Sequence, residues 1–287
     1  MRTRPVATTR PPLLARLFRQ PPARPGDSYG APGQGSSIAI SAVAVVALLF
    51  LWWLVTALGL IKPLFLPSPG AVARRFVRVM NEGFGGASLL HHTLASLARV
   101  FGAFVLAAVL AIPVGIGMGI NRVLRGIFDP PIEFYRPLPP LAYLPLTIIW
   151  FGIDELQKVV LLFLAMLAPM VLSTRAGVRS VAIEQIHAAY SMGASRAQII
   201  LHVILPAALP EIITGLRFGW GGGGTSLGAA VWGAATAGLG FMVLSAAEFL
   251  VTEVVILGIV MIGAVAYLFD LFLRWMERLL VPWKGKG

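Results

Sequence analysis

Six long apolar stretches constrain the fold of this chain more than any other feature of its sequence. A helix needs about 20 predominantly apolar residues to cross the hydrocarbon core of a bilayer. Because backbone groups in lipid must be satisfied internally, such stretches predict membrane-spanning helices. We therefore expect an all-α polytopic membrane protein with six transmembrane helices. The six stretches are Ser37–Ile61, Leu94–Ile120, Ile132–Ile153, Val159–Thr174, Val203–Ala235 and Val254–Trp275.

The overall composition agrees with this prediction and excludes several classes of protein. Hydrophobic residues make up 57% of the 287 residues and charged residues 12%, whereas soluble domains average about 45–50% and about 25%. An ordinary cytosolic enzyme and a disordered chain are both excluded. The chain has no cysteine, which excludes disulfides, cysteine-ligated metal centres and a cysteine nucleophile.

Prolines and glycines interrupt three of the six stretches. The third carries four prolines between residues 137 and 145, the fourth contains Pro169, and the fifth contains Pro206, Pro210 and a glycine run at 221–224. Such residues are tolerated in membrane helices where neighbouring helices satisfy the freed backbone groups. Interrupted spans therefore indicate a packed bundle around a pathway. The glycine run either allows tight packing or marks a broken helix, since each Gly costs about 1 kcal/mol relative to Ala.

The net charge of +11 is divided unevenly between the two sides of the predicted bundle. Fifteen of the 23 Lys and Arg residues fall in the termini and the loops on their side, five in the opposite loops and three within spans. Because cytoplasmic loops carry the excess of Lys and Arg, we expect both termini to be cytoplasmic. The same distribution over loops argues against nucleic acid as a partner.

This organisation divides the chain into three segments. Residues 1–36 are rich in Pro, Gly and Arg and are predicted to form a disordered basic cytoplasmic tail. Residues 37–281 form the six-span domain, with a long cytoplasmic loop at 176–202, and residues 282–287 form a short cytoplasmic tail. The lipid bilayer is thus a predicted partner of the chain.

One segment between the first two spans is predicted to form an amphipathic helix. Ser68–Pro69 is a helix-start signal, and Val72, Phe76 and Val79 then share one helical face, with three arginines between residues 74 and 78 elsewhere. Such a helix lies either in the membrane interface or on a solvated surface.

The cytoplasmic loop contains a helix, a glycine turn and a second helix, which we call the elbow (residues 183–199). Ile183–Met192 is predicted to be helical, and Gly193 is placed to end that helix. Ser195–Gln198 has the spacing of a capping box that starts the next helix, and Pro206 and Pro210 are expected to break or kink it.

Small residues on the first helix make the elbow a candidate docking surface. Ala188 and Ala189 are expected at an exposed position, where the absence of larger side chains lets a partner backbone approach closely. The alternative is an ordinary helical hairpin between two spans.

The spacing within this loop resembles a signature of the permease subunits of bacterial ABC importers. That signature is Glu-Ala-Ala, three residues, Gly, nine residues and Ile-x-Leu-Pro. Here Ala188–Ala189, Gly193 and Val203–Pro206 fall in the same register, and His187 occupies the Glu position. Four further phrases are similar to the taurine, nitrate and sulfonate branch of that family: Pro63–Pro69, Phe134–Leu141, Leu144–Gly152 and Gly238–Met242.

The resemblance implies a type I ABC-importer permease fold and a transport function. It implies a homodimer in the bacterial inner membrane, two cytoplasmic ATPase subunits that bind ATP and Mg, and a periplasmic binding protein that delivers taurine or a related sulfonate. The chain has no phosphate-binding loop of the G-x-x-x-x-G-K-[ST] form, so it is not expected to be an enzyme or to hold a cofactor. The residues that the resemblance assigns to ATPase coupling are His187, Ala188, Ala189, Gly193, Ala194, Ser195, Leu205 and Pro206.

Ionisable residues inside the spans are candidates for the translocation pathway, because they are costly in a bilayer. Glu133 and Arg136 lie three residues apart, where one helical face would pair them. Arg136 and Arg217 are predicted to attract a passing sulfonate, and Trp220 lies in the same stretch as Arg217. The alternative is that such charges hold the bundle together or reach the membrane interface.

Two other functions stay open at this stage. The segment at 224–228 matches the G-x-S-x-G pattern of serine hydrolases, with Ser226 as nucleophile. A membrane scaffold that binds an ATPase without transport is the second. The fifth span also departs from the family, since Val231 stands where relatives usually carry a carboxylate. The adjacent pair His91–His92 is not expected to bind a metal.

Overall fold

The computed structural model describes residues 38–231 and 237–282, with side chains from 40 to 222 and from 237 onward. All regular elements in these ranges are helices. They are α2 (Ile38–Ala57), α3 (Pro69–Glu82), α4 (Leu89–Ile120), α5 (Arg122–Tyr135), α6 (Pro140–Phe151), α7 (Glu155–Arg179), α8 (Ile183–Ser191), α9 (Arg196–Ile199), the π-helix η1 (Ile200–Ile204), α10 (Leu205–Val231), α11 (Leu239–Glu248) and α12 (Thr252–Leu280).

The chain divides into two compact units, residues 1–71 and 72–287. In the first unit, α2 is apolar around its whole circumference, as expected of a membrane span. The loop after α2 is fixed by the Trp52 indole, whose N–H donates to the Pro67 carbonyl at 3.0 Å. Ser68 then caps α3 by accepting from the Ala71 N–H at 3.2 Å, as its position predicted.

Within the described residues, five helices are long and apolar enough to cross a membrane. They are α2, α4, α7, the continuous α9–η1–α10 helix and α12. At 1.5 Å per residue, α7, with 25 residues, extends about 37 Å, which exceeds the roughly 30 Å of a hydrocarbon core. These five correspond to the first, second, fourth, fifth and sixth predicted stretches.

The third predicted stretch, Ile132–Ile153, does not form one helix. It is divided between the end of α5 and the 12-residue helix α6, and α6 alone reaches only about 18 Å. The cause is the proline cluster: Pro137 and Pro139 fall in the linker, and Pro140 begins α6 at N1, because proline lacks the N–H that a continuing helix needs.

In the second unit α7 lies between α4 and α10, and glycines make both contacts close. A Cβ added to Gly115 of α4 would lie 2.6 Å from Thr174 Cβ, and one added to Gly219 of α10 would lie 2.5 Å from Met170 Cε. Gly119 and Gly215 also meet side chains of α7. Two small-xxx-small motifs therefore face the same central helix.

This packing predicts that a Gly→Ala substitution lowers stability at one position of α4 and has little effect at another. Gly115→Ala is expected to destabilise the fold by about 1–3 kcal/mol, because the added methyl overlaps Thr174 and the Val171 carbonyl. Gly102→Ala is the matched control, since its methyl would meet open space. Thermal unfolding of both variants in detergent tests the difference, and equal midpoints would contradict the packing account.

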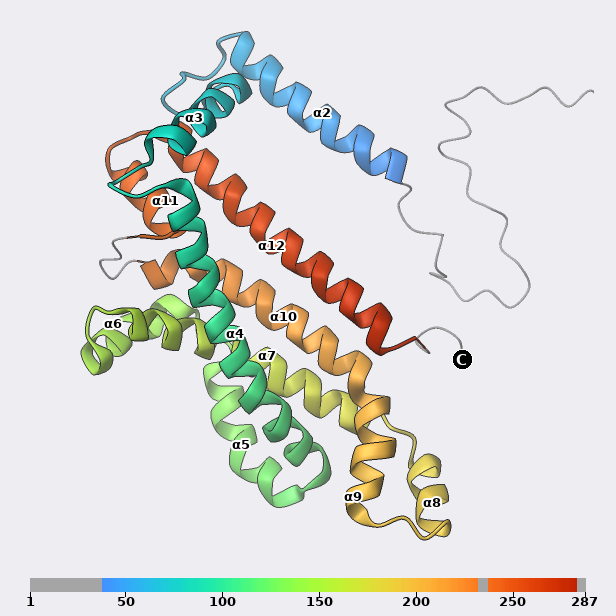
Figure 1. Cartoon of the computed structure of the whole chain (residues 1–287). Helices are drawn as coiled ribbons and strands as arrows, with labels where there is room; N and C mark the ends of the chain where they lie inside the picture. The colour runs from blue at the N-terminus through green and yellow to red at the C-terminus, as the bar shows by residue number, and fades with distance from the viewer. Residues whose placement is uncertain (1–37, 232–236, 283–287) are drawn as a thin grey trace, which may run out of the picture. The chain divides into compact units, whose positions relative to one another are not determined.

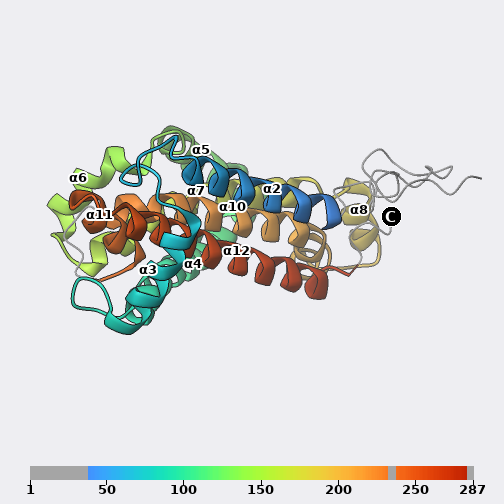
Figure 2. The same ribbon diagram turned by 90° about the horizontal axis from the view of Figure 1, so that it is seen from above.

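The short helices α6, α8 and α11 lie at two ends of the second unit. Figures 1 and 2 both show α6 and α11 toward one end of the long helices and α8 toward the other. We call these the α11 end and the α8 end. Gly238, which precedes α11, and the start of α4 meet at the α11 end, and the elbow makes up the α8 end.

Candidate functional site

The elbow has the helix–glycine–helix geometry predicted from its sequence. Helix α8 ends at Ser191, and Gly193 follows with φ of +81°, a left-handed conformation that favours glycine. The Gly193 N–H donates to the Tyr190 carbonyl at 2.9 Å, and the Ala194 N–H donates to the Ala189 carbonyl at 3.1 Å. The chain therefore reverses sharply within two residues.

The second arm of the elbow begins with the predicted capping box. The Gln198 N–H donates to Ser195 Oγ at 3.4 Å, and the Ser195 N–H donates to Gln198 Oε1 at 2.8 Å. Both hydrogen bonds satisfy N–H groups that the start of a helix leaves free. The turn and the second arm are thus fixed by local interactions.

The predicted exposure of the Ala pair is only half correct. Ala188 is exposed, but Ala189 is buried, in a cluster with Ile199 and Ile204. One helical face of α8 must pack against the second arm to hold the elbow closed, and Ala189 lies on that face. The surface that a partner would meet consists instead of Ala188, His187 and the residues at the turn.

Two exposed apolar side chains at the turn were not singled out from the sequence. Met192 is 82% exposed and Tyr190 is 50% exposed. Close by, five residues line an open hollow of about 380 Å³: Met192, Gly193, Ala194, Gln198 and His202. Apolar side chains around a hollow are typical of a docking surface.

The prolines after the elbow widen the helix but do not break it. The five residues before Leu205 form π-helix η1, and α10 continues from Leu205 through Pro206 and Pro210. A π-bulge accommodates local disruption of the hydrogen-bond ladder. Of the predicted break or kink, the break is therefore wrong. The glycine run at 221–224 also lies in unbroken helix, which runs to Val231.

At the α11 end, two polar side chains of α4 bond the backbone at the start of α11. The His92 imidazole accepts from the Gly238 N–H at Nδ1 (3.0 Å), and Nε2 contacts the Phe84 carbonyl at 2.9 Å. This pairing requires the Nε2-protonated neutral tautomer. Ser96 Oγ accepts from the Leu239 N–H at 2.8 Å. Both side chains are buried. The first two residues of the Gly238–Met242 segment are therefore hydrogen-bonded to α4.

Next to this contact lies a charged cluster of two cations and one carboxylate. Glu155 accepts hydrogen bonds from the Arg99 guanidinium and, at 2.9 Å, from Lys158 Nζ. The side chains of Arg99 and Lys158 are 9% and 3% exposed. Gly238 borders the cluster and has a φ of +130°. A Cβ at this position would lie only 2.6 Å from Arg99 Nη1, so there is no room for a side chain. Sequence reasoning did not single out Glu155, which is 56 residues from Arg99.

Of the predicted pathway residues, Glu133 and Arg136 lie together at the end of α5. Their side chains form an ion pair at 3.4 Å, as the spacing of three residues predicted, and both are about half exposed. Glu133 is also within 3.9 Å of Arg175 of α7, which pairs with Asp129 as well. These contacts dock α5 on α7.

The other two, Arg217 and Trp220, contact helix α12. Arg217 donates to Asp270 at 2.9 Å and lies 3.6 Å from Glu277. The Trp220 ring stacks on Phe269 with centroids 3.6 Å apart. These side chains therefore join α10 to α12.

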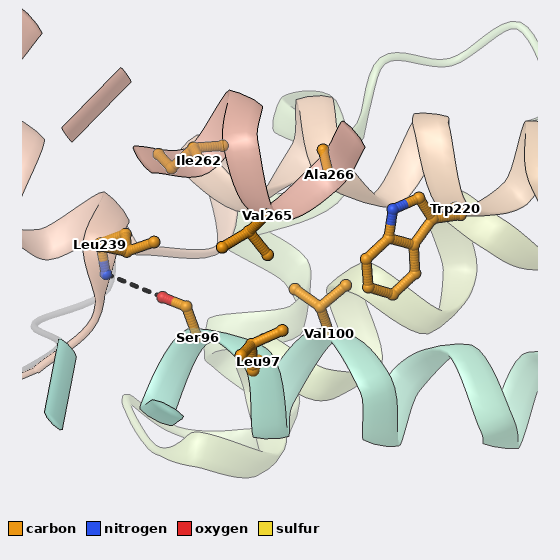
Figure 3. Close-up of a pocket in the computed structure, with 8 residues that line it drawn as sticks. All are labelled: Ser96, Leu97, Val100, Trp220, Leu239, Ile262, Val265 and Ala266. Atoms are coloured by element: carbon orange, nitrogen blue, oxygen red, sulfur yellow. Dashed lines mark hydrogen bonds between the residues drawn. The ribbon is translucent and has the colours of Figure 1, made fainter. Parts of the chain in front are cut away.

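Trp220 also borders a small apolar cavity, shown in Figure 3, between α4, α10, α11 and α12. Its volume of about 20 Å³ accommodates about one water molecule, so it is too small for an organic anion. The lining residues are Ser96, Leu97, Val100, Trp220, Leu239, Ile262, Val265 and Ala266.

The structure also bears on the serine-hydrolase pattern and on the metal-site prediction. Residues 224–228 lie within helix α10, so the strand-to-helix turn of a serine hydrolase is not present there. The Ser226 and Val231 side chains, Trp232, the tail 1–36 and most of 282–287 lie outside the described residues. Among described residues, no group of three His, Asp or Glu side chains is arranged to hold a metal ion.

Comparison with known proteins decides the family. Residues 107–283 match the model of the binding-protein-dependent transport system inner membrane component. The chain belongs to this family of ABC transporter permeases. It is therefore a multi-pass membrane protein and a transport subunit rather than an enzyme.

Relatives with assigned roles lie in the branch that the sequence resembles. The permease is 52% identical over 250 residues to the taurine transport system permease protein TauC of Escherichia coli, covering 87% of this chain and 91% of that one. It is 32% identical over 235 residues to the putative aliphatic sulfonates transport permease protein SsuC of Bacillus subtilis, covering 82% and 84%.

A solved structure supports the fold. The permease matches a chain of the inward-facing MetNI methionine ABC transporter with a TM-score of 0.57 at 20% identity, covering 67% of this chain and 95% of that chain. The predicted architecture of a type I ABC-importer permease is thereby confirmed.

Proposed function

We propose that this permease forms the pathway of an ATP-driven importer for taurine or a related sulfonate. The 52% identity to the Escherichia coli taurine permease, over most of both chains, supports this substrate class. In this proposal the chain pairs with itself, with both termini in the cytoplasm of a bacterium. Separate cytoplasmic ATPase subunits bind ATP and Mg, and a periplasmic binding protein delivers the substrate.

The elbow is the observation that supports coupling to an ATPase. It presents His187, Ala188, Gly193 and Ser195 at an exposed turn beside Met192. Of the other coupling residues, Ala189, Ala194 and Leu205 pack in one apolar cluster, and Pro206 follows in α10. The proposed docking surface therefore combines a fixed backbone with apolar side chains.

The continuity of α9, η1 and α10 supports a mechanical role for the elbow. These elements follow one another without an intervening loop, so a displacement of the elbow is transmitted along α10. ATP binding would draw the elbows of two copies together, and hydrolysis would release them. The pathway then alternates between its two openings, as in other transporters built from rocking helices.

Within the pathway, Arg136 and Glu133 remain the proposed ionisable residues. Arg136 is half exposed and its one ion-pair partner among the described residues is Glu133 at 3.4 Å, which leaves its guanidinium able to meet an anion. Arg217 is already paired with two carboxylates and Trp220 is buried. We assign these two to the contact with α12.

A single cysteine tests the docking surface, because the natural chain has none. Met192→Cys places one exposed thiol at the turn of the elbow. We expect a bifunctional thiol–amine reagent to cross-link this variant to a co-expressed taurine-type ATPase subunit. Glu248→Cys, exposed at the α11 end, is the matched control and should not cross-link. Cross-linking from residue 248 alone would place the ATPase at the wrong end.

A further inference from the structure

A second cavity lies where the third predicted span is broken, between the α5–α6 linker, α7 and α10. Its volume is about 150 Å³, which holds roughly ten water-sized groups. It is several times larger than the apolar cavity beside Trp220 and is bordered by more polar atoms. The lining includes Tyr135, Arg136, Tyr143, Ala165, Pro169 and Gly222.

The proline break brings the polar groups to this cavity. Helix α5 ends at Tyr135, and Arg136 caps it with its N–H bonded to the Ile132 carbonyl at 3.0 Å. The linker prolines then start α6, which carries Tyr143 in its first turns. A continuous helix would not hold these three side chains around one space.

One of these polar groups has no hydrogen-bond partner among the described residues. The Tyr135 hydroxyl lies buried near the Ala168 backbone and makes no hydrogen bond of normal geometry. A buried hydroxyl without a partner is unfavourable and rare in native proteins. A ligand in the cavity that accepted its hydrogen bond would remove this cost.

The opposite wall offers a hydrogen-bond acceptor. Pro169 has no N–H, so the Ala165 carbonyl lacks its usual donor four residues along α7. The facing residue is Gly222, and a Cβ there would lie 3.6 Å from the Ala165 oxygen. Gly222 therefore places no side chain against this oxygen, and both residues line the cavity.

We propose that this cavity is a transient binding site for a small aminoalkanesulfonate during translocation. The sulfonate is held by Arg136 and the Tyr135 and Tyr143 hydroxyls, and the ammonium group by the Ala165 carbonyl. Hydrogen-bond donors on one wall would bind the anionic end of a short zwitterion, and the carbonyl acceptor on the other wall would bind its cationic end. The inference rests on the proposed function, because it names where that substrate binds within the permease.

Tyr135→Phe tests the site, since it removes one oxygen and keeps the ring. A structural role and a binding role predict different results. If the hydroxyl binds substrate, the melting temperature stays the same or rises, because a buried unpaired group is lost. The initial rate of ATP-dependent taurine uptake into proteoliposomes, with the ATPase and loaded binding protein present, falls about tenfold, as expected for one lost hydrogen bond to a charged group.

Two further variants make the result specific. Tyr143→Phe is expected to lower uptake in the same way without loss of stability. Tyr267→Phe on α12, 62% exposed, is the matched control and should transport like the natural chain.

The outcomes separate this proposal from the proposed function. Wild-type uptake with unchanged rates in both Tyr135→Phe and Tyr143→Phe would overturn the site and leave the permease assignment intact. A fall in uptake matched by a fall in melting temperature would also overturn it, as a structural effect. No uptake of taurine by the wild-type complex would overturn the proposed function, and the site with it.

Discussion

Gly193→Pro is expected to abolish ATP-dependent uptake while leaving the helical bundle folded. Proline fixes φ near −65° and removes the N–H, whereas Gly193 has φ of +81° and donates to the Tyr190 carbonyl. The substitution costs at least about 3 kcal/mol at the turn, a roughly hundredfold shift in the population of the native elbow. Uptake and transport-coupled ATP hydrolysis are the measurements.

Gly193→Ala separates strain from a general sensitivity of the elbow. Its methyl group would meet open space, so only the positive φ is penalised, by about 1–2 kcal/mol. We expect reduced but measurable uptake. The packing of α7 between α4 and α10 is remote from this turn, so both variants should insert and melt like the natural chain. Normal uptake by Gly193→Pro would show that the elbow does not couple ATP hydrolysis to transport.

Glu155→Gln is expected to cause a large loss of stability. It leaves Arg99 and Lys158 buried without a carboxylate, since no other Asp or Glu in the described part of the chain lies within 4.0 Å of either cation. The Glu155 side chain is itself 54% exposed, so the loss is that of hydrogen bonds between charged groups, about 2–3 kcal/mol, and not the full penalty of a buried ion pair. For a protein of this size, that lowers the melting midpoint by about 5–10 °C.

Asp154→Asn is the matched control at the neighbouring carboxylate. Asp154 caps α7 through its Oδ1, which accepts from the Glu155 N–H at 2.7 Å, and the Asn amide oxygen keeps this role. Its melting midpoint should therefore stay close to that of the natural chain. Equal midpoints for the two variants would contradict the account of the charged cluster.

The features that sequence predicted well depend on local interactions. The elbow follows from Gly193 and the Ser195–Gln198 capping box, each of which acts within a few residues. The close helix contacts at Gly115 and Gly219 have a similarly local basis, because a glycine on a membrane helix leaves room for a neighbour. Each of these signals lies within one turn or one helix.

The features that sequence missed depend on which helices meet. Glu155 and Arg99 come from helices 56 residues apart, and Arg217 meets Asp270 across 53 residues. No periodicity identifies such partners. The burial of Ala189 has the same cause, because it requires α8 to fold back on the second arm of the elbow.

The third span shows a different limit. The prolines predict an interrupted span over Ile132–Ile153, but they do not predict its division into two separate short helices. Apolar composition indicates that a segment is buried or contacts lipid. It does not distinguish one long helix from two short ones. The break at Arg136–Pro139 is what places Tyr135 and Tyr143 at the larger cavity.

The uptake of labelled taurine into proteoliposomes tests the central claim most directly. The permease is reconstituted with a taurine-type ATPase subunit and binding protein, and uptake is compared with and without internal ATP. We predict accumulation that requires ATP, the binding protein and the permease together. ATPase binding without uptake of taurine or any other sulfonate would contradict the account and favour a scaffold role.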